Sequence, residues 1–129
     1  MSHWTKAQLT EFATADDMHV SPFYDDGKTY GTPTWIWSVV VADELYVRAW
    51  NGQQSRWYQS AQQQRAGRIT LAGQKFEVSF NPVVSDDRLT AAVSQAYEKK
   101  YAGSPYLPPM LAAGPVSATV RIDLKGSVN

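Results

Sequence analysis

Apolar and polar residues alternate along several short stretches of the chain, a pattern typical of strands with one buried face. The clearest stretch is 116–124, where every second residue from Val116 to Leu124 is apolar. The same pattern predicts strands over 19–23, 33–42, 45–50, 68–71 and 75–83. Pro22 marks the first as an edge strand, because proline cannot donate to a ladder. Stretch 33–42 is apolar on both faces, which predicts a central strand.

Helical spacing of apolar residues predicts three helices between these strands. They cover Thr5 to Ala15, which begins with a capping box, Ser55 to about Gln64, and Asp86 or Asp87 to about Tyr101. A proline-stiffened loop is expected over 103–110. This order favours a small antiparallel barrel with flanking helices, a mainly β chain of the α+β class. With 129 residues, we expect a single domain over 1–129.

Composition narrows the kinds of partner. Lys plus Arg and Asp plus Glu number 12 each, and this balance argues against a general electrostatic grip on nucleic acid or anionic lipid. No apolar run has the length of a membrane span, and the N-terminus lacks the apolar core of a secretory signal. The chain has no Cys and only two His far apart, so no metal site is expected. We therefore expect a cytoplasmic protein.

Several motifs in consistent order, from His19 to the last predicted strand, closely resemble a bacterial family. They are His19-Val20-Ser21-Pro22-Phe23, Tyr30-Gly31-Thr32-Pro33-Thr34-Trp35-Ile36-Trp37, Leu45-Tyr46-Val47-Arg48-Ala49, Asn51-Gly52, Ser55-Arg56-Trp57-Tyr58, Ala66-Gly67-Arg68-Ile69 and Lys100-Tyr101-Ala102-Gly103-Ser104-Pro105-Tyr106-Leu107. The family is domain-of-unknown-function family 2255. It resembles a branch of the FMN-binding split-barrel superfamily, which includes pyridoxamine-phosphate oxidases and deazaflavin-dependent nitroreductases.

The resemblance implies a six-stranded antiparallel split barrel that forms a homodimer. It also implies that FMN or a deazaflavin is held at the dimer interface, but it implies no particular activity. One departure is visible, because Tyr24 stands where an arginine is expected in many relatives. If that arginine binds ligand, this chain lacks one contact.

A flavin phosphate needs guanidinium, hydroxyl or helix N-terminal amide donors. Arg48, Ser55, Arg56 and Arg68 are the candidates, and Ser55-Arg56 opens a predicted helix just after a strand. The alternative for Arg48 and Arg68 is pairing with surface carboxylates. For the flat ring, the candidates are Trp35, Trp50 and Trp57, and the alternative for each is packing in the core or a dimer interface. Thr32 and Thr34 could donate to the ring edge.

His19 is the candidate acid–base group, since the ordinary histidine pKa lies near working pH. The alternative is a histidine hydrogen-bonded to a loop carbonyl. The sequence contains no nucleophile elbow, no Walker loop and no dinucleotide glycine motif, so hydrolase and NTPase functions lose support. A flavin enzyme needs no such motif, because the cofactor carries the hydride chemistry.

The function predicted from these residues is a flavin- or deazaflavin-dependent oxidoreductase acting on a small molecule. The first alternative is a small-ligand or cofactor-binding protein without turnover. The second is a cofactor-free enzyme on the same barrel, with His19 or Tyr106 as the acid–base group.

Overall fold

Seven antiparallel strands form one curved sheet in the computed structural model, which describes residues 4–83 and 86–125. The strands are β1 (His19–Pro22), β2 (Thr34–Trp35), β3 (Ser38–Val41), β4 (Glu44–Arg48), β5 (Ala66–Leu71), β6 (Gln74–Pro82) and β7 (Thr119–Leu124). The helices are α1 (Lys6–Thr14), η1 (Gly52–Gln54), α2 (Arg56–Gln64), α3 (Asp87–Lys100), α4 (Leu107–Met110) and α5 (Ala113–Ser117). The chain is thus mainly β with flanking helices, of the α+β class.

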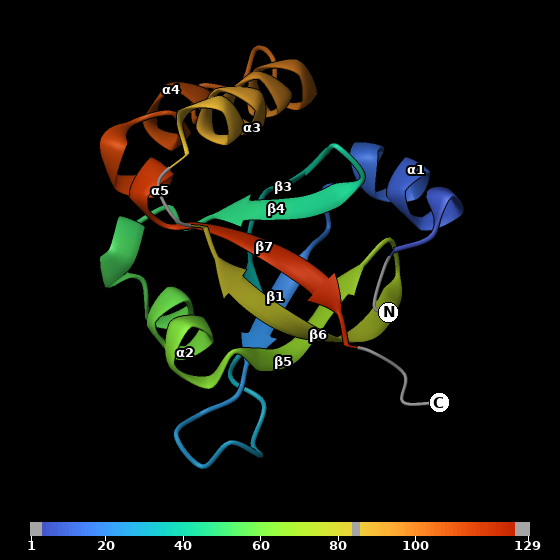
Figure 1. Ribbon diagram of the computed structural model, residues 1–129, viewed down its shortest axis with the longest axis vertical. Helices are drawn as coiled ribbons and strands as arrows, with labels where there is room; N and C mark the ends of the chain where they lie inside the picture. Colours follow the sequence, from blue (N-terminus) through green and yellow to red (C-terminus); the bar gives the residue numbers. More distant parts are fainter. Residues whose placement is uncertain (1–3, 84–85, 126–129) are drawn as a thin grey trace.

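The strand order β2-β1-β5-β6-β7-β4-β3 explains how the sheet curves into a half-barrel. Its two edges, β2 and β3, are consecutive in the chain and are separated only by Ile36 and Trp37. The two edge strands are therefore held close together by the short connection between them. Figure 1 shows the curvature of the sheet, with β3 and β4 lying across from β5 and β6. The predicted strand over 33–42 is wrong in two respects. It breaks into two strands, so the sheet has seven strands rather than six, and both pieces lie at edges rather than in the centre.

The prediction that 19–23 forms an edge strand is also wrong. β1 pairs with β2 on one side and with β5 on the other, and Pro22 sits at its last position. Gly67 of β5 allows the close approach there, since a Cβ at Gly67 would lie 2.5 Å from the Ser21 carbonyl oxygen. Proline is tolerated inside the sheet because it occupies a strand end.

Two tight turns set the registers of the hairpins. Ala42 and Asp43 join β3 to β4, and Ala72 and Gly73 join β5 to β6; all four have positive φ. Two consecutive residues with positive φ match the twist of antiparallel strands. The first turn thus takes in Ala42, which the sequence assigned to the strand over 33–42.

Alternation along β4 divides its side chains between two cores. Leu45 and Val47 point into the barrel, while Tyr46 packs outside it in a second core beneath α3. The barrel core also contains Phe12 from α1 and Trp57 from α2. Both faces of β4 are therefore buried, which matters because Arg48 follows on the outer face.

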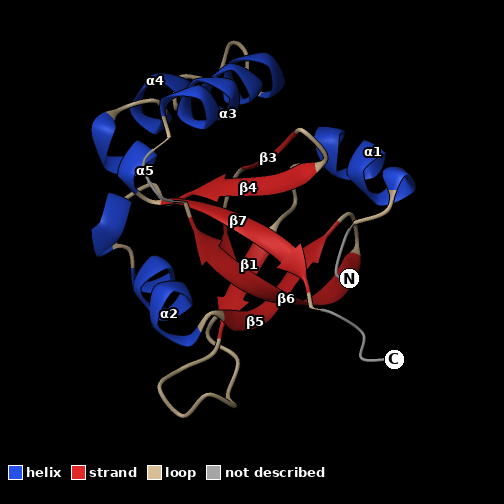
Figure 2. Cartoon of the chain, viewed as in Figure 1, coloured by secondary structure: helices blue, strands red, loops and turns tan. Residues whose placement is uncertain are grey.

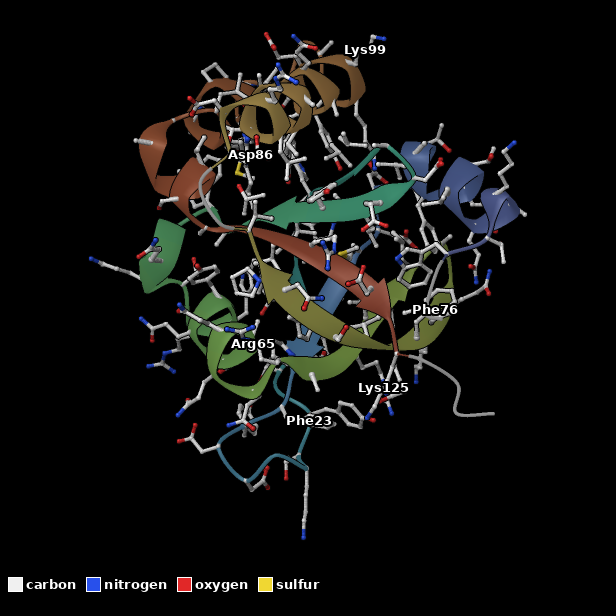
Figure 3. All side chains as sticks on the ribbon, in the orientation of Figure 1. Phe23, Arg65, Phe76, Asp86, Lys99 and Lys125 are labelled. Carbon is white, nitrogen blue, oxygen red and sulfur yellow. The ribbon has the colours of Figure 1, made fainter. Side chains whose placement is uncertain are left out.

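Helices surround the sheet (Figure 2), with α1 and α2 on opposite flanks and α3, α4 and α5 grouped at the end where β3 and β4 lie. α3 is capped by Asp86, whose carboxylate accepts from two helix amides, and it carries Lys99 in its last turn. Figure 3 shows these two residues at opposite ends of the helix. Each charge complements the helix dipole.

The segment between α3 and β7 differs most from its prediction. Region 107–117 forms α4 and α5, where the sequence predicted a loop and the start of the last strand. β7 accordingly begins at Thr119 instead of Val116. Proline in the first turn of α4 is compatible with a helix, because the first amides of a helix need no intrahelical acceptor.

Candidate functional site

An apolar pocket of about 440 Å³ opens where the β2–β3 junction, the end of β4 and α4 meet. Its volume lies within the usual range of small-molecule sites. Seven residues line it: Trp35, Ile36, Trp37, Arg48, Trp50, Tyr106 and Met110. The lining is dominated by aromatic rings and holds one charged side chain.

That charged side chain, Arg48, is fully buried. Its Nε donates to Thr119 Oγ1 at 3.2 Å, its Nη1 to the Met110 carbonyl at 3.4 Å and its Nη2 to the Thr90 carbonyl at 3.2 Å. The guanidinium carbon also lies 5.4 Å from the centre of the Tyr97 ring. Burial lowers the pKa of Arg48, although arginine remains a cation in proteins.

No carboxylate pairs with Arg48 within the described residues, whose ion pairs involve Arg68 and Arg121 instead. Burying a charge without a counter-ion is expensive. Arg48 is thus a buried cation held by neutral acceptors in the wall of an aromatic pocket. This arrangement is what an anionic ligand group would complement.

Aromatic contacts fix the orientation of the pocket walls. The Trp37 ring stacks on Tyr101, with ring centres 3.9 Å apart and planes 4° from parallel. Trp50 meets Tyr106 edge to face at 5.9 Å, and Trp35 Nε1 donates to the Asp16 carbonyl at 2.7 Å. Trp35, Trp50 and Tyr106 are 58, 47 and 61% exposed, so they form the mouth of the pocket.

The end of α3 holds the backbone of the β2–β3 junction. Tyr97 Oη donates to the Trp37 carbonyl at 3.2 Å, and Lys100 Nζ donates to the Ser38 carbonyl at 2.7 Å. Tyr101 Oη both donates to the Ser38 carbonyl and accepts from the Ser38 amide, each at 3.2 Å. Edge-strand groups that would otherwise lack partners are thus satisfied by side chains.

Burial shifts the pKa values of these three side chains, two in the last turn of α3 and one at its C-cap. It raises the pKa of Tyr97 and raises that of Tyr101 to about 12, so both hydroxyls remain protonated at neutral pH. It lowers the pKa of Lys100 to about 8. Each shift follows from the cost of a charge in a poorly solvated place.

Three of the predicted cofactor residues, Trp35, Arg48 and Trp50, meet in this pocket. The other predicted residues do not line it. Thr32 and Thr34 are exposed, and Arg56 is exposed at the start of α2. Ser55 is the N-cap residue of α2, but its side chain makes no capping hydrogen bond, and Trp57 packs into the barrel core.

Arg68 belongs to a separate surface cluster. Its Nε lies 3.1 Å from Glu77 Oε2, and its guanidinium lies 3.8 Å from the centre of the Tyr30 ring. Tyr30 Oη donates to Glu77 Oε1 at 2.6 Å. The carboxylate alternative was therefore right for Arg68 and wrong for Arg48, which is buried against carbonyl groups.

His19 lies outside the pocket lining. Its Nδ1 is 3.1 Å from the Asp17 carbonyl, the loop-carbonyl contact that the sequence offered as its alternative role. Tyr106, named only as an acid–base alternative, does line the pocket.

Ile36, Trp37 and Met110 were not predicted as site residues. The first two lie where the expected continuous strand breaks, and Met110 ends a helix that was expected to be a loop. The sequence signals for Trp37 are its place two residues after Trp35 and its position at the end of the motif that begins at Tyr30.

Within residues 4–83 and 86–125, no group of three or more His, Asp or Glu side chains is arranged to hold a metal ion. In the same residues, every helix is too short or too polar to cross a membrane.

Fold and pocket define the molecule as an antiparallel half-barrel with helices around it and an aromatic, arginine-bearing cavity. The chain belongs to the bacterial family described as "Uncharacterized protein conserved in bacteria (DUF2255)", whose model matches residues 8–122.

Among solved structures, the fold is similar to that of the conserved hypothetical protein Rv2991 from Mycobacterium tuberculosis. The TM-score is 0.65 at 16% identity, and the match covers 96% of this chain and 81% of that one. At this identity the likeness concerns the fold alone. No curated protein matches the chain significantly.

Proposed function

We propose that the pocket binds a planar aromatic molecule with an anionic group, and that the protein uses it as a flavin- or deazaflavin-dependent oxidoreductase. The observation that carries the binding proposal is Arg48, a fully buried cation without a carboxylate partner among the described residues. Indole and phenol rings around it offer faces and edges to a flat ligand. The redox part rests on the resemblance to FMN-binding split barrels.

The residues present fit the ring of a flavin better than its phosphate. Trp35, Trp37 and Trp50 suit the ring, and Arg48 would face an electron-rich edge of it. A bound flavin would supply the hydride chemistry, while these residues would bind the ring and exclude water from it. The remaining predicted phosphate ligands, Ser55, Arg56 and Arg68, lie outside the pocket lining.

A homodimer is part of the proposal. Trp35, Trp50 and Tyr106 are large, exposed aromatic side chains at the pocket mouth, and a second copy could cover them. A second copy could also bring donors for a cofactor tail. The protein, in this proposal, acts on a small molecule in the cytoplasm.

A second candidate is a small-ligand-binding protein without redox turnover. It is favoured by the separation of Arg56 and Arg68 from the pocket, since a flavin phosphate would then lack its expected donors. The two candidates share the pocket and differ in its occupant.

Absorbance of the purified protein and fluorescence titration with FMN, riboflavin and a deazaflavin cofactor test the proposal. We expect saturable binding of at least one of them at micromolar concentration. Arg48→Met should weaken this binding, while Arg65→Met, a change at an exposed arginine outside the lining, should leave it unchanged. A colourless protein that binds none of the three would refute the oxidoreductase.

A further inference from the structure

We propose that the pocket selects an aromatic monocarboxylate, with Arg48 as the residue that determines specificity for the single negative charge. This inference rests on the proposed function in one respect, namely that the aromatic pocket is the ligand site. The acid would lie against the same aromatic walls as the flavin ring of the oxidoreductase proposal, so the two are alternative occupants of the pocket. Under the binding-protein alternative the acid would be the ligand itself.

The hydrogen bonds of Arg48 leave donors for a ligand. A guanidinium has five N–H groups. Three are used, one each on Nε, Nη1 and Nη2, and they donate to the neutral oxygens of Thr119, Met110 and Thr90. One N–H on each terminal nitrogen is thus left without an acceptor among the described residues. Carboxylate oxygens match guanidinium donors in spacing and in plane.

The charge of the site matches one negative charge and no more. Arg48 is the single charged residue in the lining. The nearby ammonium of Lys100 is already held by the carbonyls of Phe12 and Ser38 and does not line the pocket. A phosphate monoester carries up to two negative charges, so one of them would be buried there without a partner. The site therefore favours a carboxylate over a phosphate.

The shape of the site requires the rest of the ligand to be flat and apolar. Trp37 is fixed by its stack on Tyr101, and Trp50 by its edge contact with Tyr106. Ile36 and Met110 add aliphatic surface and no charge. A fused-ring acid can place its ring among these groups while its carboxylate meets Arg48.

Three probes that differ only in the polar group test the charge preference. They are naphthalene-2-carboxylate, the neutral naphthalene-2-carboxamide and 2-naphthyl phosphate, titrated at pH 8 by quenching of tryptophan fluorescence. Since a hydrogen bond to a charged group is stronger than one between neutral groups, we expect the carboxylate to bind roughly 10- to 100-fold tighter than the carboxamide. We expect the phosphate to bind at least about tenfold weaker than the carboxylate, because its second charge has no partner.

Arg48→Met should abolish the preference for the carboxylate over the carboxamide, whereas Arg65→Met should retain it. The comparison of probes on the unaltered protein needs no variant, so it stands even if Arg48→Met does not fold. Equal binding of the carboxylate and the carboxamide, or no binding of any naphthalene, overturns the inference.

The two proposals can fail separately. Flavin binding without a carboxylate preference leaves the oxidoreductase in place and removes the ligand class. An Arg48-dependent carboxylate preference without flavin binding removes the oxidoreductase and keeps the aromatic monocarboxylate as the ligand class.

Discussion

The hydroxyl of Tyr101 is a small group with a large predicted effect, and Tyr101→Phe removes it alone. This hydroxyl donates to the Ser38 carbonyl and accepts from the Ser38 amide at the edge of β3. The ring stays, so its stack on Trp37 is preserved in the variant. The substitution therefore isolates the hydrogen bonds that hold the β2–β3 junction beside the pocket.

The size of the stability loss in Tyr101→Phe follows from the hydrogen bonds that the Ser38 carbonyl and amide retain. The carbonyl retains Lys100 Nζ at 2.7 Å, whereas the amide loses the side-chain acceptor that Tyr101 provides. Ser38 is fully buried, and a buried donor without its acceptor costs about 1–3 kcal/mol. With an unfolding slope of roughly 2 kcal/mol/M, a loss of about 2 kcal/mol moves the urea midpoint down by about 1 M.

Urea unfolding at neutral pH, followed by circular dichroism, measures the effect, and Tyr106→Phe is the matched control. Tyr106 is 61% exposed, and no described residue is hydrogen-bonded to its hydroxyl. We expect the control to stay within about 0.5 kcal/mol of the parent, as surface substitutions usually do. A Tyr101→Phe midpoint indistinguishable from that of Tyr106→Phe would refute the reasoning.

Three further predictions concern pH and packing. Burial lowers the pKa of Lys100 to about 8, below the unfolded value of about 10.4. Between those pH values the unfolded chain binds more protons than the folded one, so stability should increase with pH. We expect the thermal midpoint of the parent, relative to that of Lys100→Met, to rise as the pH is raised from about 8 to about 10.4; a difference that stays constant with pH would contradict this. Asp17 accepts from two amides of the β5–β6 turn, chiefly that of Ala72, which lowers its pKa. The stability advantage of the parent over Asp17→Asn should be present above about pH 4 and fade as pH falls through the lowered pKa; a melting difference that persists at pH 2 would be evidence against it. Gly67→Ala should lower the free energy of unfolding in urea by about 1–3 kcal/mol, because the added Cβ would collide with the backbone of Ser21 and Pro22. Gly114→Ala is the control, since its added Cβ has no atom within 4 Å; equal stability of the two variants would rule this out.

Sequence patterns predicted those helices and strands that are determined by residues close to one another in the sequence. The structure confirms the capping box at Thr5 and the two strands that became β5 and β6. Of the two predicted starts of α3, Asp86 and Asp87, it selects Asp86 as the N-cap. All of these features are set by residues close in sequence. The break between β2 and β3 is different. Alternation continues through it, with Ile36 in the barrel core and Trp37 in the outer one. What changes at the break is the partner strand, and one-dimensional periodicity carries no information about partners.

Arg48 shows the same limit at the level of the site. Alternation along 45–50 predicted that it shares a side with Tyr46, away from Leu45 and Val47, and the two cores agree with that division. The sequence then left two roles open, a ligand for an anion or a partner for a surface carboxylate. Neither included burial under α3 and α4 against backbone carbonyls. Those carbonyls belong to segments about 40 to 60 residues away along the chain, so only the tertiary structure reveals them. Because neutral acceptors neutralise none of its charge, burial of Arg48 is costly, and this cost is the physical ground for the proposal that Arg48 binds an anionic group of a ligand.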